Sequence, residues 1–307
     1  MSEAVARLDG WLFAPEPAGR VRALRIGIAA LLLFRLVTGP YADLGGQPAA
    51  LFRPVWFLWW LDQMPSREVL VGLQLVGAAA AGLAIVRRCE RASFLVAWSS
   101  LLVLDACWAS RGKVQHNDLP LLLVAAVLAL APMGIRLADD RRGAAWGWPV
   151  RTSILVVTSI YMLTGFQKVI SSGPAWVLSD HMRNVMYGAA LTGKAPTDEV
   201  SRFIADRPHV AHLVALATIV IELGAVVPLL WARTRVAYVV AIALLHLGVY
   251  FTHGLDYSMW VGVAAVVLID WRPAVLRLVS APRPGRSPEL HSPRTSETPA
   301  AEPRRDP

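Results

Sequence analysis

Lysine, cysteine and charge of either sign are scarce in this chain. Of its 307 residues 17% are charged and 55% are hydrophobic, and the mean hydropathy is +0.48. This balance excludes an ordinary soluble domain. The 30 basic residues include only three lysines, Lys113, Lys168 and Lys194. An arginine keeps its proton in proteins whereas an amine can lose it, so a lysine placed among apolar residues is a candidate base.

Motifs of soluble enzymes are missing as well. The sequence has no G-x-S-x-G, no P-loop, no H-E-x-x-H and no G-x-G-x-x-G after a strand. The two cysteines, Cys89 and Cys107, are expected a membrane span apart, which excludes a disulfide between them. His246 and His253 lie about 10 Å apart along a helix, too far to share one ion, so we expect no metal.

Long apolar runs are what the chain has instead. Eight of them approach the roughly 20 residues that cross a bilayer, and they span about 21–40, 69–86, 93–110, 119–133, 152–170, 210–231, 236–252 and 257–271. We predict an all-α, multi-pass integral membrane bundle of about eight transmembrane helices. The first run has no small-residue cleavage site after it, so we do not expect a cleaved signal peptide.

Arginines mark every second connection between these runs. Arg20, Arg22 and Arg25 stand at the start of the first run, and further arginines join the second to the third, the fourth to the fifth and the sixth to the seventh. By the positive-inside rule both termini are cytoplasmic, and we expect a bacterial plasma membrane protein. The net charge of +8 follows from this orientation, so membrane lipids are expected partners and a nucleic acid is not.

Composition divides the chain into two regions. Residues 1–275 form the predicted helix-bundle domain. Residues 276–307 are rich in Pro, Ser, Glu and Arg, and we expect them to form a disordered cytoplasmic tail. The connection 171–209 is too long for a simple turn, so we expect a short interfacial helix within it.

Ionisable residues gather toward one side of the predicted membrane. The outer half or outer mouth holds Arg35, Asp105, His116, Asp118, Lys168, His246 and His253, with Glu222 near mid-membrane. The inner halves of the helices hold almost none. Charged groups in lipid are costly and normally face a protein interior or a wet cavity, so we expect a polar pocket that opens outward.

Helical spacing places several of these residues on shared faces. One face of the fifth run collects Tyr161, Thr164, Gly165 and Lys168, and one face of the seventh collects His246, Tyr250 and His253. Thr218 and Glu222 are similarly spaced on the sixth. Gly165 would let a neighbouring helix or a flat ligand come close.

Each of these residues also has a purely structural interpretation. A lysine at a helix end can extend into the headgroups without a chemical role. His246 can be hydrogen-bonded between helices, and Glu222 can be the buried ion-pair partner of Arg35 or of Lys168.

The sequence also resembles a family of membrane enzymes. Residues 161–170, followed by Trp176, are similar to the segment that carries the catalytic lysine in vitamin K-dependent gamma-carboxylases and their bacterial transmembrane relatives. Residues 113–118 resemble the family's Asn/His-containing segment, and residues 245–253 resemble a later family helix with a histidine. The resemblance covers about residues 20–272.

This resemblance implies a chemistry. Lys168 would take a proton from a hydroxyl of a lipid hydroquinone, giving an anion that reacts with oxygen, and His116 would assist by stabilising the oxyanion. We expect these two residues to be catalytic and a lipid quinone to be the substrate or cofactor. The candidate substrate-binding residues are Asn117, Tyr161, Gly165, Glu222, His246, Tyr250 and Arg35.

The chain departs from the gamma-carboxylases after the eighth run. Those enzymes carry a large extramembrane domain that holds a propeptide, whereas this chain has a short tail, so it is more similar to the compact horizontally transferred transmembrane (HTTM) branch and its protein substrate is unknown. Two other functions stay open. Arg35, Lys168 and Glu222 could bind an anionic or zwitterionic solute in a binding or transport protein. The chain could also be a non-catalytic membrane partner.

Overall fold

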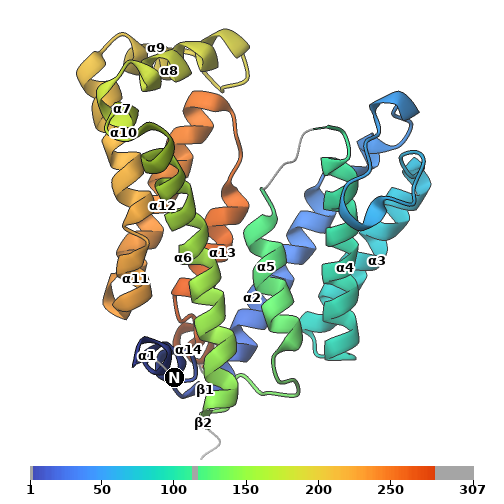
Figure 1. Ribbon diagram of the computed structural model, residues 1–307. Helices are drawn as coiled ribbons and strands as arrows, with labels where there is room; N and C mark the ends of the chain where they lie inside the picture. Colours follow the sequence, from blue (N-terminus) through green and yellow to red (C-terminus); the bar gives the residue numbers. More distant parts are fainter. Residues whose placement is uncertain (1–2, 113–116, 281–307) are drawn as a thin grey trace, which may run out of the picture.

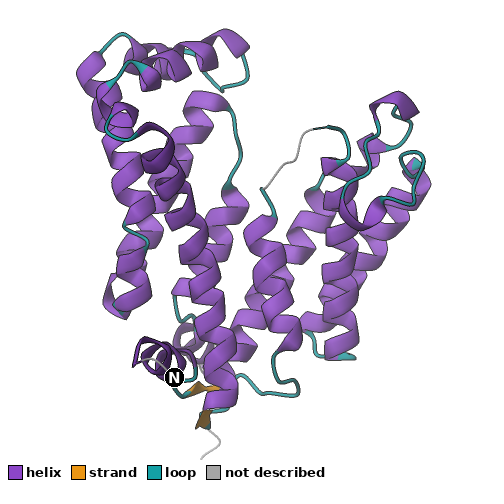
Figure 2. Ribbon diagram, viewed as in Figure 1, coloured by secondary structure: helices purple, strands orange, loops and turns teal. Residues whose placement is uncertain are grey.

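The computed structural model describes residues 3–112 and 117–280. The regular secondary structure of this part of the chain is almost all helical (Figures 1 and 2). Its α-helices are α1 Glu3–Leu12, α2 Ala18–Thr38, α3 Arg67–Ile85, α4 Glu90–Ala109, α5 Leu119–Leu130, α6 Ala144–Ser172, α7 Ala175–Leu178, α8 His181–Thr192, α9 Glu199–Ala205, α10 Pro208–Leu223, α11 Val226–Leu230, α12 Arg235–His253, α13 Ser258–Leu268 and α14 Arg272–Ser280. Short 3-10 helices span Tyr41–Leu44, Ala49–Leu51, Trp56–Leu58 and Ala232–Thr234. Strands β1 Glu16–Pro17 and β2 Arg142–Gly143 pair antiparallel.

Within the described residues, five stretches are long and apolar enough to cross a membrane: α3, α4, α6, Pro208–Leu230, which combines α10 and α11, and Ala232–His253, which contains α12. α5 and α13 are apolar but shorter, with 12 and 11 residues. α2 has 21 residues but carries four arginines. Each predicted apolar run therefore falls on one or two helices. The all-helical fold is confirmed, and the apolar helices support the predicted membrane character.

The helices form two groups (Figure 1). α2 to α5 make up one group, and α6 with α10 to α13 makes up the other, which α7 to α9 cover at one end. α6 and α13 pack against α2 and α5 and join the groups. Leu32 of α2 is fully buried in the core that the two groups share, whereas Leu163 of α6 and Leu213 of α10 are 66% and 64% exposed. Apolar side chains on the outside suit a lipid environment.

The end of the bundle near the N-terminus holds buried charge. Arg22 and Arg25 lie inside α2, and both donate to Glu90 at the start of α4, at 3.1 and 2.9 Å. Arg25 is fully buried and also donates to the carbonyl oxygen of Pro132, at 3.0 Å. The expectation that this side of the helices holds almost no ionisable group is therefore wrong. α2 begins at Ala18, which brings its arginines into the bundle, where carbonyl groups at helix ends and a carboxylate accept their hydrogen bonds.

Three elements at this end had no counterpart in the predicted arrangement. α1 lies against the start of α6. Strand β1 pairs with β2, which lies in the α5–α6 connection. α14 continues beyond the expected tail boundary at residue 275. Residues 113–116, with Lys113 and His116, and residues 281–307 lie outside the described part of the chain.

Candidate functional site

A cavity of about 570 Å³ lies among the helices of the second group. Its described lining residues all fall between Tyr161 and Trp260, on α6 to α10, α12, the α12–α13 loop and α13. Most of the wall is apolar, with Met182, Met186 and Ile204 on the covering helices. The volume falls within the range of about 300–1,000 Å³ typical of small-molecule sites.

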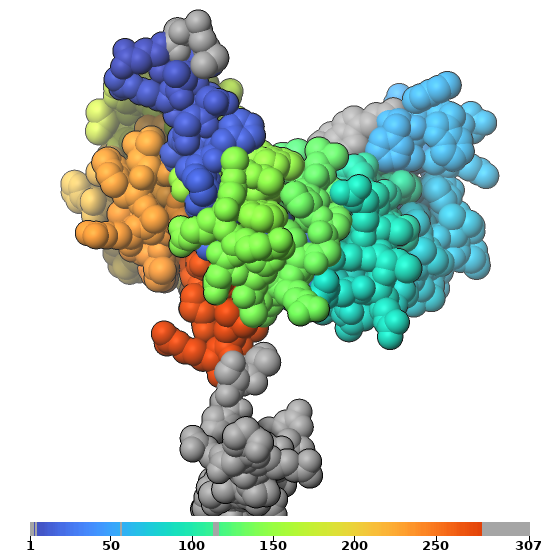
Figure 3. All heavy atoms as spheres, turned by 90° about the horizontal axis from the view of Figure 1, so that it is seen from below, coloured from blue at the N-terminus to red at the C-terminus, as the bar shows by residue number. Residues whose placement is uncertain are grey.

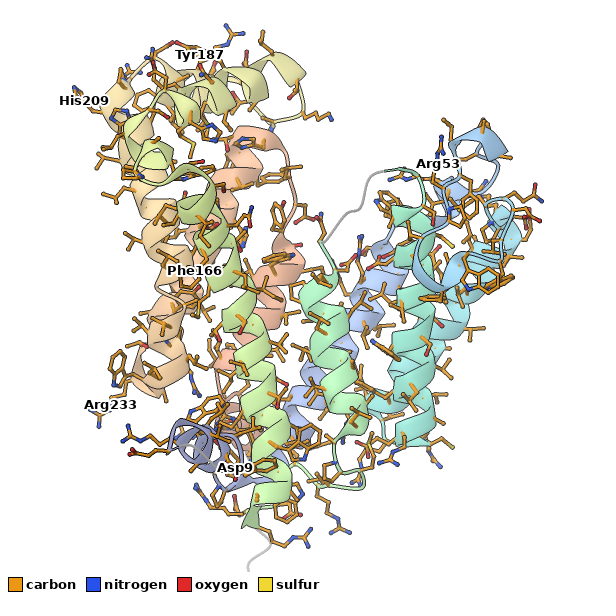
Figure 4. The ribbon with its side chains drawn as sticks, in the orientation of Figure 1. Asp9, Arg53, Phe166, Tyr187, His209 and Arg233 are labelled. Carbon is orange, nitrogen blue, oxygen red and sulfur yellow. The ribbon has the colours of Figure 1, made fainter. Side chains whose placement is uncertain are left out.

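The covering helices fill the long connection before α10. α8 and α9 pack on each other, and Ser201 of α9 donates to the carbonyl oxygen of Thr252 on α12, at 2.8 Å, with both residues buried. At the end of α12, Gly254 has a φ of +66° and lies so close to Lys194 that a Cβ there would be 2.0 Å from its carbonyl oxygen. These contacts fix the cover over the cavity. The prediction of a helix within this connection is confirmed, and three helices occupy it (Figure 4, where Tyr187 marks α8).

Lys168 and Glu222 form an ion pair on the cavity wall, through Nζ and Oε1. Their side chains are 18% and 9% exposed. Gly165, one turn before Lys168, allows this pairing because it has no side chain. A Cβ at this position would lie 3.0 Å from the Cβ of Glu222 and 2.9 Å from the side chain of Leu223. Glycine lets α10 approach α6 closely. Of the two partners considered for Glu222, Lys168 is the one observed.

Two aromatic side chains lie next to this ion pair. The Lys168 Nζ lies 5.4 Å from the centre of the Trp176 ring, a cation–π distance. The Trp176 ring packs at 4.5 Å on the imidazole of His181, at the start of α8. Both residues line the cavity. The lysine head is thus held between a carboxylate and an indole, and it is turned into the protein rather than extended toward the headgroups.

A second polar point lies deeper along α6. The hydroxyl of Tyr161 and Nε2 of His246 are hydrogen-bonded at 2.9 Å, and the imidazole packs on Tyr257 and Trp260 with ring centres 5.0 and 5.9 Å away. Nδ1 of His246 is buried and has no hydrogen-bond partner among the described residues. Tyr161 precedes Lys168 by seven residues, so the two polar points are about 10 Å apart along the helix.

The Lys168–Glu222 pair can exchange a proton without moving net charge. With the proton on nitrogen the pair is an ammonium and a carboxylate, and with the proton on oxygen it is an amine and a carboxylic acid. Both forms are neutral overall, which lowers the cost of either in apolar surroundings. Oε2 of Glu222 is buried and accepts no hydrogen bond from the described residues. The arrangement is therefore suited to transfer a proton to or from a ligand in the cavity.

Arg35 belongs to a separate cluster in the first group of helices. Its Nε donates to Oδ2 of Asp118, at 2.6 Å, and its guanidinium lies 5.3 Å from the centre of the Tyr41 ring. The Tyr41 hydroxyl donates to Asp105, at 2.7 Å. Burial raises the pKa of the Tyr41 phenol, as do both aspartates, so it stays a hydrogen-bond donor. This cluster joins α2, α4 and the start of α5, and Arg35 is not placed with Lys168.

Two further candidates lie away from the cavity wall. Tyr250 is 43% exposed and packs on Phe251. α12 turns Leu245, Val249 and Thr252 to the cavity, and about 100° of rotation per residue points Tyr250 outward. Asn117 donates to the carbonyl oxygen of Asp256, at 3.1 Å, which ties the start of α5 to the α12–α13 loop.

Two residues of the cavity wall, His181 on the cover and Trp260 on α13, could not be identified from the sequence. His181 follows Asp180 at a helix start, where its local sequence does not distinguish it from a surface histidine. Trp260 of α13 is 7% exposed and lines the cavity, and its local sequence does not distinguish it from a tryptophan at a membrane interface. Both were accessible only through the tertiary arrangement.

Comparisons of the chain with protein-family models, curated proteins and solved structures find no match. The resemblance to the gamma-carboxylases and the HTTM branch therefore stays a prediction. The candidate site rests on its own geometry.

Proposed function

We propose that this chain is a multi-pass membrane enzyme that removes a proton from a hydroxyl of a lipid-soluble substrate, and that the substrate is a reduced quinone. The observation that carries the proposal is the Lys168–Glu222 pair on the wall of a largely apolar cavity. An apolar wall accepts a lipid-soluble ring or chain, and a neutral ion pair within it supplies both a proton acceptor and a positive charge.

The proton moves in two linked transfers. The substrate hydroxyl gives its proton to Nζ of Lys168 as Lys168 passes a proton to Oε1 of Glu222. The O–H bond of the substrate breaks, its electron pair stays on oxygen, and Glu222 becomes a carboxylic acid. Lys168 ends as an ammonium beside the new oxyanion and stabilises it. The anion is then the species that reacts with oxygen, which acts as the oxidant.

Other residues have supporting roles in this proposal. Trp176 offers a flat surface on which a substrate ring can stack, next to the lysine head. His246, held by Tyr161, offers a hydrogen bond to a second polar group of the substrate. His116 is the proposed oxyanion donor only by the family resemblance. A bacterial plasma membrane with the cavity toward the outer side is part of the same proposal.

A binding or transport role is the second candidate, and the ion pair itself favours it. A zwitterionic solute can exchange partners with Lys168 and Glu222, so that each charge stays paired when the solute is bound. No proton transfer is then needed. The two candidates differ in whether the bound molecule is chemically changed.

Turnover in proteoliposomes tests the proposal. The detergent-purified protein is first examined by mass spectrometry for bound quinone, and consumption of the reduced quinone is then followed with oxygen present. Wild type should consume the reduced quinone. Lys168→Arg should fold, but its turnover should be roughly 10²–10⁴-fold lower, because arginine does not release its proton. Lys194→Arg, an exposed lysine on the cover, is the matched control and should be silent. Full activity of Lys168→Arg would remove the lysine from the chemistry, and no turnover by wild type would favour binding or transport.

A further inference from the structure

A cluster of arginines lies at the end of the bundle near the N-terminus, well away from the cavity residues. Arg235 of α12 interacts electrostatically there with Arg20 of α2 and with Arg151 of α6. The acidic residue that interacts with all three is Glu16 of β1. Figure 3 views this face, where the blue α1 crosses beside the green α6.

Both carboxylate oxygens of Glu16 accept hydrogen bonds from two of these arginines. Its Oε2 accepts from Arg20, at 2.9 Å, and its Oε1 accepts from Nε and a terminal nitrogen of Arg151, at 3.1 and 3.0 Å. Three guanidinium groups therefore face one carboxylate, which leaves an excess of two positive charges.

Arg235 carries the unmatched charge. It is 7% exposed, and its Nε donates to the carbonyl oxygen of Pro228, at 3.1 Å. Within residues 3–112 and 117–280 its terminal nitrogens have no hydrogen-bond acceptor and no carboxylate partner. Because Glu16 is shared with two other arginines, the free terminal nitrogens of this largely buried guanidinium are suited to a negatively charged ligand.

The start of α12 adds to the positive potential. Arg235 is the first residue of this 19-residue helix, and the preceding Thr234 makes no side-chain cap. The dipole of this helix is positive at its start and favours an anion. Trp231 and Arg233, both exposed, flank the site, as is usual where a helix meets the membrane surface.

We propose that Arg235, with Arg20 and Arg151, binds a phosphate oxyanion. The forked geometry of guanidinium groups suits the oxygens of phosphate, and several such groups from different helices can surround it. The phosphate belongs either to the headgroup of an anionic phospholipid or to free inorganic phosphate.

Thermal unfolding of the full chain in nanodiscs separates these sources. One set of discs contains phosphatidylcholine alone, one contains phosphatidylglycerol as well, and one contains phosphatidylcholine with inorganic phosphate in place of chloride at equal ionic strength. The variants are Arg235→Gln and, as a matched control, Arg233→Gln. Arg233 lies two residues away, is exposed, and points away from the bundle (Figure 4).

For a lipid headgroup, phosphatidylglycerol should raise the unfolding temperature of wild type and of Arg233→Gln but not of Arg235→Gln. The affinity for the anionic lipid, measured by native mass spectrometry, should fall at least roughly fivefold on loss of Arg235. If only the inorganic phosphate discs produce this pattern, the ligand is soluble phosphate.

An equal response of wild type and Arg235→Gln to both phosphate sources would overturn the proposal. So would an equal loss in Arg233→Gln, which would indicate diffuse surface charge. If Arg235→Gln does not fold, Arg151→Gln replaces it, because it removes one charge from the same cluster and leaves the Arg235–Pro228 bond in place. It should lose the same response, and a retained response would contradict the proposal.

Discussion

Replacing Lys168 by methionine should destabilise the protein through the partner that it leaves behind. Methionine keeps an apolar stem but removes the ammonium, so the largely buried Glu222 loses its counter-charge. Its second oxygen has no hydrogen-bond partner in the described part of the chain to compensate. Removing one member of a buried pair costs roughly 3–5 kcal/mol.

Protonation of the carboxylate sets an upper limit on this loss. Neutralising an ordinary glutamate costs about 1.4 kcal/mol for each pH unit above its usual pKa of about 4.3, which gives about 3.7 kcal/mol at pH 7 and about 1 kcal/mol at pH 5. In the variant the folded protein holds this proton and the unfolded chain releases it, so stability falls as the pH rises. We expect a loss of about 3–4 kcal/mol at pH 7 that shrinks to about 1 kcal/mol at pH 5.

Unfolding in detergent at the two pH values measures this directly. The comparison needs wild type, Lys168→Met, Glu222→Gln and the double variant. The double variant buries no unpaired charge and should lie within about 1 kcal/mol of wild type at both pH values. A Lys168→Met loss that does not depend on pH, together with additive single losses in the double variant, would refute the buried pair.

Three further predictions concern the bundle. Gly165→Ala should lower the free energy of unfolding by roughly 1–3 kcal/mol, because its Cβ would lie 2.9 Å from a side chain of α10. The control Gly82→Ala, whose Cβ would have nothing within 4 Å, should raise it by about 0.5–1 kcal/mol. Equal effects of the two substitutions in thermal unfolding would contradict the close helix contact. Truncation after Ser280 should leave the yield and unfolding temperature of the purified protein unchanged, and a large loss of folded protein would mean that the tail packs on the bundle. A periplasm-dependent reporter should be inactive after Trp271 and active near Thr192, and the reverse pattern would place the cavity at the cytoplasmic side.

Local periodicity was enough to predict the parts of the site that lie on one helix. The spacing of Tyr161, Gly165 and Lys168 placed them on one face of α6, and that face lines or borders the cavity. Charge in an apolar segment marked Glu222 as a residue that needs a partner. These inferences depend on helix geometry and on the cost of charge in lipid, which the sequence contains.

Contacts between helices could not be predicted in the same way. The sequence left Glu222 with two possible partners, and only the approach of α10 to Gly165 selects Lys168 over Arg35. Arg35 pairs with Asp118 because α2 ends beside the start of α5. Tyr250 shares a helical face with His246 and His253 but is not among the residues that line the cavity, because the rotation of α12 about its own axis depends on its neighbours.

The most direct test of the proton transfer is the turnover of reduced quinone by Lys168→Arg, Glu222→Gln and the double variant in proteoliposomes. If the two residues pass a proton as a unit, the turnover of each single variant falls roughly 10²–10⁴-fold, and the double variant is no slower than the slower single variant. Full turnover by either single variant, or losses that multiply in the double variant, would contradict the account.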